Sequence, residues 1–151
     1  MLFRSNTSAA DAALARVDAL LQDVTTLDLG PEPASVPEGK TVYYIACSVP
    51  VCAEIQTGVE AAVAALASKG WTLKTTSHQD TPDTVAAAFD AAIAAKPDVV
   101  MTSGNPRDWF KSQLDTLTGM GVPVISWSIP EPFEPGSGIN VNILDRKSTR
   151  L

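Results

Sequence analysis

The sequence predicts an α/β fold, a three-layer parallel sheet with helices on both faces, preceded by an amphipathic helix. From residue 40 onward, short apolar segments alternate with longer segments of helical periodicity. The first apolar segment, residues 42–47, has apolar side chains on both faces, as a buried parallel strand requires. Strands that alternate with helices of this length form a parallel sheet through right-handed crossovers.

The segment before this alternation has a different character. Residues 8–24 predict an amphipathic helix, with Ser8 as its N-cap and Leu14, Val17, Leu21 and Val24 on one face. Residues 30–39 contain three prolines and two glycines, a composition that indicates an extended linker. We therefore expect residues 6–39 to be a helix and linker, and residues 40–144 to be the core domain.

The first half of the core domain contains two strand–helix units. A helix over residues 51–69 follows the first strand and ends at Gly70, a favourable residue after a helix. Residues 71–76 form a second strand, nearer an edge because it alternates more strictly. Thr81 and Pro82 are typical of the N-cap and first position of the next helix, which stops before Pro97.

The second half repeats the pattern. Residues 98–102 predict a third strand, and Asn105-Pro106 opens a helix with Phe110, Leu114 and Leu117 on its buried face. Residues 122–127 predict a fourth strand. A proline- and glycine-rich loop over residues 130–138 then leads to a fifth strand at residues 139–144.

Both ends of the chain resemble translated sequencing adapters. Residues 145–151 read DRKSTRL, the translation of a common short-read adapter, and residues 1–5 resemble the opposite adapter. We expect both ends to be artefacts, the alternative for the basic end being a natural tail. The natural segment would then be a fragment, residues 6–144.

The charge and the apolar pattern exclude two classes of partner. The whole chain has 11 basic and 17 acidic side chains, and residues 6–144 have 7 and 16, a net charge of −9. An acidic surface disfavours nucleic-acid binding. No apolar run approaches the roughly 20 residues of a membrane span, so we expect no membrane insertion of this segment.

The turn after the first strand is the most informative part of the chain, because ligands bind at the carboxyl ends of such strands. It reads CSVPVC over residues 47–52, without a glycine-rich phosphate loop. Cys47 and Cys52 are the only cysteines. They form either a disulfide, as in exported proteins, or two small buried hydrophobic side chains. With no catalytic constellation and a single histidine, His78, the sequence favours binding over catalysis, with no cofactor and no metal.

The order of these segments resembles a known family. CSVPVC, KPDVV, SGNPRD, GVPVISW and GINVNI, in this order over residues 40–144, are similar to the amino-terminal lobe of type 1 periplasmic substrate-binding proteins, the ribose-binding-like components of ABC importers. The resemblance implies a periplasmic-binding-protein-like type I fold, first lobe only, whose second lobe would close over one ligand.

The resemblance also implies which residues face the ligand. They lie after the first, third and fourth strands, and are Ser48, Val49, Pro50, Val51, Cys52, Ser103, Asn105, Arg107, Trp109, Trp127 and Ser128. Sugar-binding relatives commonly have an aspartate–arginine pair after the fourth strand. The residues here are Ser128 and Ile129, which makes a simple sugar a poorer expectation.

Several of these residues have a structural alternative. Trp127 is either a ring that stacks on the ligand or a core side chain under the following loop. We expect Asn105 to cap a helix first, and Arg107 to form a solvated pair with Asp108 unless it meets an anionic ligand group. Trp109 would more often pack against the core, and Trp71 would anchor the turn after Gly70. The carboxylates of Asp80, Asp83 and Asp108 are expected to serve capping and solubility.

The leading functional hypothesis is capture of a small polar solute, a sugar or a sugar-like molecule, for an ABC permease. The resemblance places the full-length protein in the periplasm or otherwise outside the cytoplasm, with lipid anchoring as one form. The alternative is the effector-binding core of a lactose-repressor-type regulator. An enzyme is not expected, because the chain has neither a glycine-rich turn nor catalytic groups in a recognisable arrangement.

Overall fold

The computed structural model describes residues 7–21, 31, 33–131 and 134–143, and the chain divides into two units. The first contains α1 (Thr7–Leu21), and the second, residues 35–145, contains all other elements. These elements are, in order, β1 (Thr41–Ala46), α2 (Pro50–Ala65), η1 (Ala67–Lys69), β2 (Thr72–Ser77), α3 (Pro82–Ala95), β3 (Val99–Thr102), η2 (Arg107–Trp109), α4 (Lys111–Gly119), β4 (Val124–Trp127) and β5 (Val141–Ile143).

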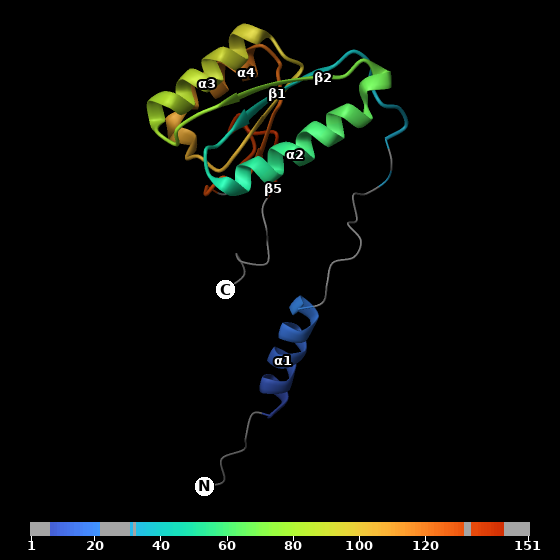
Figure 1. Cartoon of the computed structure of the whole chain (residues 1–151). Helices are drawn as coiled ribbons and strands as arrows, with labels where there is room; N and C mark the ends of the chain where they lie inside the picture. Colours follow the sequence, from blue (N-terminus) through green and yellow to red (C-terminus); the bar gives the residue numbers. More distant parts are fainter. Residues whose placement is uncertain (1–6, 22–30, 32, 132–133, 144–151) are drawn as a thin grey trace. The chain divides into compact units, whose positions relative to one another are not determined.

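The five strands form one parallel sheet in the order β2-β1-β3-β4-β5, which confirms the predicted fold class (Figure 1). β1 lies between β2 and β3, with Tyr44 opposite Thr75 on one side and Met101 on the other. Five of its six residues are buried. Because every strand runs the same way, the loops that follow the strands all leave from one edge of the sheet.

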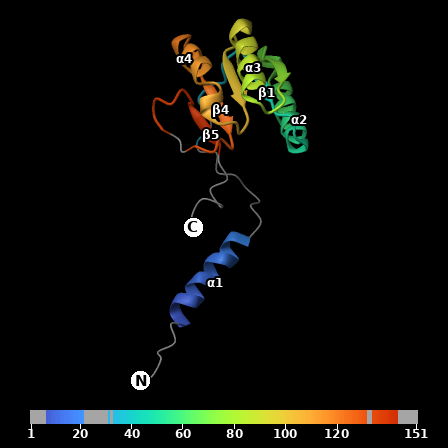
Figure 2. The ribbon, with the colours of Figure 1, turned by 90° about the vertical axis from the view of Figure 1, so that its left-hand side faces the viewer.

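Two apolar cores lie on opposite faces of the sheet, as the three-layer prediction requires. Figure 2 shows the helices of the two outer layers, α2 on one side of the sheet and α3 and α4 on the other. Tyr43 and Ile45 of β1 point to the larger core, which α3 and α4 cover and in which Phe89 and Phe110 stack with ring centroids 4.3 Å apart. Tyr44 and Ala46, the alternate residues of β1, point to the smaller core beneath α2. The side-chain period of two in a strand therefore divides β1 between the two layers.

The face that α2 covers is only partly filled. An apolar groove of about 600 Å³ runs beside α2, and its floor includes Val99, Met101 and Ile125. Nothing in the sequence pattern predicts this groove, because the periodicity of one helix does not show how much of a sheet that helix covers.

Two helix ends differ from the prediction, the end of α2 and the start of α4. The helix expected to continue to residue 69 ends at Ala65, and Gly70 instead follows the 3₁₀ turn η1. Pro82 is the first residue of α3, and the Thr81 N–H donates to Thr84 Oγ1. The helix predicted to begin at Asn105-Pro106 is instead a 3₁₀ turn, η2, followed by α4 from Lys111. The Arg107 N–H donates to the Glu131 carboxylate at 3.0 Å, so a residue distant in the sequence satisfies the donor that Asn105 was expected to satisfy.

The first unit contains the predicted amphipathic helix. α1 begins at Thr7, so Ser8 lies inside the helix and is not its N-cap. Leu14, Val17 and Leu21 are 62%, 49% and 74% exposed. Val24 and the suggested adapter residues, 1–5 and 145–151, lie outside the described residues. No helix in the part of the chain that the structure describes is long and apolar enough to span a bilayer.

Candidate functional site

The loops that follow β1, β2, β3 and β4 meet at the carboxyl edge of the sheet around a cavity of about 230 Å³. Its lining combines small, polar and aromatic side chains from all four loops, namely Cys47, Val49, Val51, Cys52, Asp80, Ser103, Gly104, Asn105, Trp127 and Ser128. This is the edge where open parallel sheets bind their ligands. We call the cavity that these residues line the edge cavity.

A disulfide fixes the first wall of the edge cavity. Cys47 follows β1, Cys52 lies in the first turn of α2, and the two are bonded with their Cα atoms 5.6 Å apart. This distance is usual for disulfides, so of the two alternatives for the cysteines the structure adopts the bridge. Cys52 is 1% exposed, whereas Val49 and Val51 stay about half exposed at the rim.

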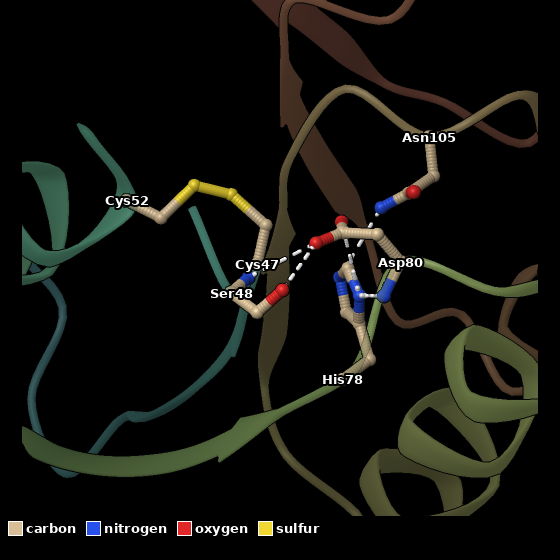
Figure 3. Close-up of a disulfide and its surroundings, with 6 residues drawn as sticks. All are labelled: Cys47, Ser48, Cys52, His78, Asp80 and Asn105. Carbon is tan, nitrogen blue, oxygen red and sulfur yellow. Dashed lines mark hydrogen bonds and ion pairs between the residues drawn. A yellow bond between two sulfur atoms is a disulfide. The ribbon is translucent and has the colours of Figure 1, made fainter. Parts of the chain in front are cut away.

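A carboxylate joins this wall to the loop after β2. Asp80 Oδ2 accepts hydrogen bonds from Ser48 Oγ at 2.5 Å and from the Ser48 N–H at 3.3 Å (Figure 3). Asp80 adopts a left-handed backbone with φ 53°. Such a conformation costs free energy in a residue other than glycine and persists where surrounding contacts require it. In this conformation Asp80 binds Ser48 through its carboxylate and His78 through its backbone N–H.

His78 lies beneath Asp80 and is 2% exposed. Its Nδ1 accepts the backbone N–H of Asp80 at 3.1 Å, and its Nε2 lies 3.1 Å from the side-chain amide of Asn105. Burial lowers the pKa of His78, and the charge of Asp80 raises it by less. The imidazole is therefore neutral near pH 7, and its 3.4 Å contact with Asp80 Oδ1 is not an ion pair.

The remaining wall depends on a close approach between two loops. A Cβ at Gly104 would lie 2.5 Å from the carbonyl oxygen of Ser128, so only glycine fits there. Ser128 itself has φ 58°. Beside this contact, Ser103 is 1% exposed, and its buried Oγ has no hydrogen-bond partner among the residues that the structure describes. A buried hydroxyl without a partner is a candidate contact for a polar ligand.

Trp127 has one side in the edge cavity and one in the protein interior. Burial raises the pKa of the Tyr44 hydroxyl, and the nearby Trp127 indole lowers it by less. The indole N–H and the hydroxyl do not reach hydrogen-bond geometry with each other, and both are buried. The structure thus combines the two alternatives for Trp127, because the ring lines the cavity while its N–H is directed to buried Tyr44.

The predicted ligand contacts do not all reach the cavity. Val51, Cys52, Asn105, Trp127 and Ser128 line it, and Ser48 adjoins it through Asp80. Arg107 is not among the lining residues. Its Nε lies 3.9 Å from Glu131, which replaces the expected pair with Asp108. Trp109 packs against the larger core.

Asn105 was expected to cap a helix, and this expectation was wrong. Its side chain binds His78, and η2 has no side-chain cap among the described residues. Asp80 and Gly104 are cavity residues that the sequence interpretation missed, and it also missed His78, which lies behind the cavity and contacts Asp80 and Asn105. Asp80 was assigned to capping and solubility, although its position after the second strand places it at the same edge as Ser48.

Within the described residues, no three His, Cys, Asp or Glu side chains cluster in a way that could hold a metal ion. The edge cavity offers hydrogen-bonding groups, a carboxylate, an amide and two hydroxyls, beside an aromatic ring and an apolar rim. These groups suit the non-covalent binding of a small polar molecule.

Solved structures share this fold. The chain is similar to a carbohydrate transporter from Acidothermus cellulolyticus 11B in complex with myo-inositol, at 20% identity and TM-score 0.55 over 70% of this chain and 36% of that chain. It is also similar to a periplasmic ribose ABC transporter from Conexibacter woesei DSM 14684, at 20% identity and TM-score 0.51 over 65% and 33%. A third match, at 19% identity and TM-score 0.54 over 60% and 32%, is a candidate LacI transcriptional regulator from Bacteroides fragilis.

No protein-family model and no curated protein matches the chain. The structural matches show that residues of the second unit adopt the type I periplasmic-binding-protein fold, as the sequence resemblance implied. The chain spans about a third of the length of these proteins.

The close approach at Gly104 predicts a strong response to a single methyl group. Gly104→Ala should lower the free energy of unfolding by about 1–3 kcal/mol in urea titrations, because the loops after β3 and β4 must separate. Gly58→Ala is the matched control. Gly58 lies in α2, and no atom approaches the position that an added methyl group would take, so alanine there should stabilise by about 0.5–1 kcal/mol. Equal effects of the two substitutions would contradict the close approach.

The buried imidazole predicts a pH dependence of stability. Because burial lowers the folded-state pKa of His78 below its ordinary value of 6.5, the unfolded chain binds a proton that the folded chain does not. Stability should therefore fall as the pH drops below about 6.5. In urea titrations from about pH 7.5 to about pH 5.5, His78→Gln should show a shallower fall than the original chain. Parallel curves would show that His78 titrates alike in both states.

Proposed function

We propose that the edge cavity captures a small polyhydroxylated solute without chemical change. The observation that carries the proposal is the meeting of four strand-end loops around hydrogen-bonding groups and an aromatic ring. The Asp80 carboxylate can accept hydrogen bonds from hydroxyl groups, and the Ser103 hydroxyl can donate to them or accept from them. Trp127 offers a surface for the apolar face of a ring. This combination is suited to a molecule with hydroxyls at its edge and C–H groups on its faces.

The fold supports the same function. Two of the matched structures are described as a carbohydrate transporter with myo-inositol and a ribose ABC transporter. The edge cavity, at about 230 Å³, is below the roughly 300–1,000 Å³ of typical ligand sites. In our proposal it is one wall of a cleft, and a second lobe of a longer protein supplies the other wall.

We further propose that the longer protein serves an ABC permease outside the cytoplasm. The Cys47–Cys52 disulfide supports this location, because disulfides persist in oxidising compartments and are rare in the cytosol. The similar protein from Conexibacter woesei is described as periplasmic. Delivery to a permease follows from the proposed family role.

A second candidate is the effector-binding core of a transcription regulator, which the match to the Bacteroides fragilis protein favours. The gene upstream of this chain separates the two. An export signal, with or without a lipidation cysteine, would support the transport function. A basic helix-turn-helix would support the regulator, in which the same cavity would bind an effector.

Ligand titration of the ¹⁵N-labelled chain tests the proposal directly. Adding myo-inositol or D-ribose should shift the amide signals of residues 47–52, 103–105 and 127–128. We expect affinities in the range of about 1 mM or weaker, since one wall provides the contacts. Shifts spread evenly over the chain, or none at all, would contradict a binding site here.

Trp127→Ala should weaken binding of the same probes about tenfold, because the stacking surface is lost. Trp71→Phe is the matched control. Trp71 donates its indole N–H to the Pro37 carbonyl at 2.7 Å and lies outside the edge cavity, so this change should leave the affinity unaltered. An unchanged affinity in Trp127→Ala would remove Trp127 from the site.

A further inference from the structure

The hydrogen bonds around His78 determine its tautomer. The backbone N–H of Asp80 points at Nδ1 from 3.1 Å. A backbone N–H can only donate, so Nδ1 must be the ring nitrogen without a proton. The proton of the neutral imidazole is then on Nε2. Protonation of both nitrogens would place two donors against each other at Nδ1, and burial opposes the charged ring as well.

This tautomer sets a requirement on Asn105. Its side-chain amide lies 3.1 Å from Nε2 through the nitrogen Nδ2. Nδ2 is only a donor, and a protonated Nε2 is also a donor, so this pairing leaves no acceptor between them. Exchanging the amide oxygen and nitrogen by rotation about the last side-chain bond resolves the conflict. Oδ1 then accepts the Nε2 proton, and the NH₂ group points away from the ring.

We propose that His78 is a positioning residue that holds Asn105 with its NH₂ group toward the edge cavity. The relay runs from the Asp80 N–H to His78 Nδ1, and from His78 Nε2–H to Asn105 Oδ1. Asn105 is 6% exposed and lines the cavity, so its free amide hydrogen is offered there to a ligand. The role toward a ligand deepens the proposed function and rests on it.

The two sides of the cavity offer different hydrogen-bonding groups to a ligand. At Asn105 the site provides a donor, which suits a hydroxyl, ring ether, carbonyl or carboxylate oxygen and disfavours an ammonium group. On the loop after β2, the carboxylate of Asp80 provides an acceptor. A vicinal diol can satisfy both, because one hydroxyl accepts from Asn105 while another donates to Asp80. His78 itself is not one of the residues that line the cavity, so it acts on a ligand only through Asn105.

The tautomer can be measured without any ligand. His78 is the only histidine of the chain, so a long-range ¹H–¹⁵N correlation spectrum of the ¹⁵N-labelled full chain contains one imidazole. At about pH 7 we expect a protonated Nε2 and an unprotonated Nδ1, with an Hε2 signal that exchanges slowly because Asn105 accepts it. A protonated Nδ1, or a doubly protonated ring, would overturn the proposal.

The action through Asn105 is tested with myo-inositol as the probe. His78→Phe keeps an aromatic ring but removes the hydrogen bond that holds the Asn105 side-chain amide. Asn105→Ala removes that amide itself. Each should weaken binding by about tenfold, and the double variant should be no weaker than Asn105→Ala alone, because His78 acts only through Asn105. Additive losses would overturn the positioning role. If the original chain binds no myo-inositol, the proposed function fails, and the tautomer spectrum still decides the orientation of Asn105.

Discussion

The hydrogen bonds of Asp80 are the interactions on which the edge cavity depends. One carboxylate oxygen accepts two hydrogen bonds from Ser48, while the backbone N–H of the same residue binds His78. These contacts connect three segments, the disulfide turn after β1, the turn after β2 and the loop that contains Asn105. Asp80 has a positive φ and lines the cavity, so its backbone conformation and the shape of the cavity are linked through the same residue.

The sheet makes this connection geometrically attainable. Five parallel strands direct all their following loops to one edge. The alternation of Tyr43 and Tyr44 between two cores holds β1 on both faces. The loops can therefore combine polar groups and a strained turn at this edge, since the buried apolar side chains of the layers provide the main stabilisation. The division of roles is that of a binding site on a rigid scaffold.

Sequence reasoning recovered the strands, the helices and their order, because each depends on local periodicity and on glycine or proline at the ends. The family resemblance implied that Trp127 and Ser128 face the ligand, and both line the cavity, because Trp127 ends β4 and Ser128 follows it. Sequence reasoning failed where the partner is distant. The Glu131 carboxylate takes the capping role expected of Asn105, and Asn105 turns to His78, 27 residues earlier. Gly104 was missed because the Ser128 carbonyl it contacts belongs to another strand's loop.

A double-mutant cycle on Ser48 and Asp80 tests the central claim most directly. Ser48→Ala, Asp80→Asn and the double variant are compared by the free energy of unfolding in urea. Our account predicts a coupling energy of about 1 kcal/mol, because a charge-assisted hydrogen bond between partly exposed groups joins the two loops. Additive effects, to within about 0.3 kcal/mol, would contradict it and would show that the loops keep their places without this bond.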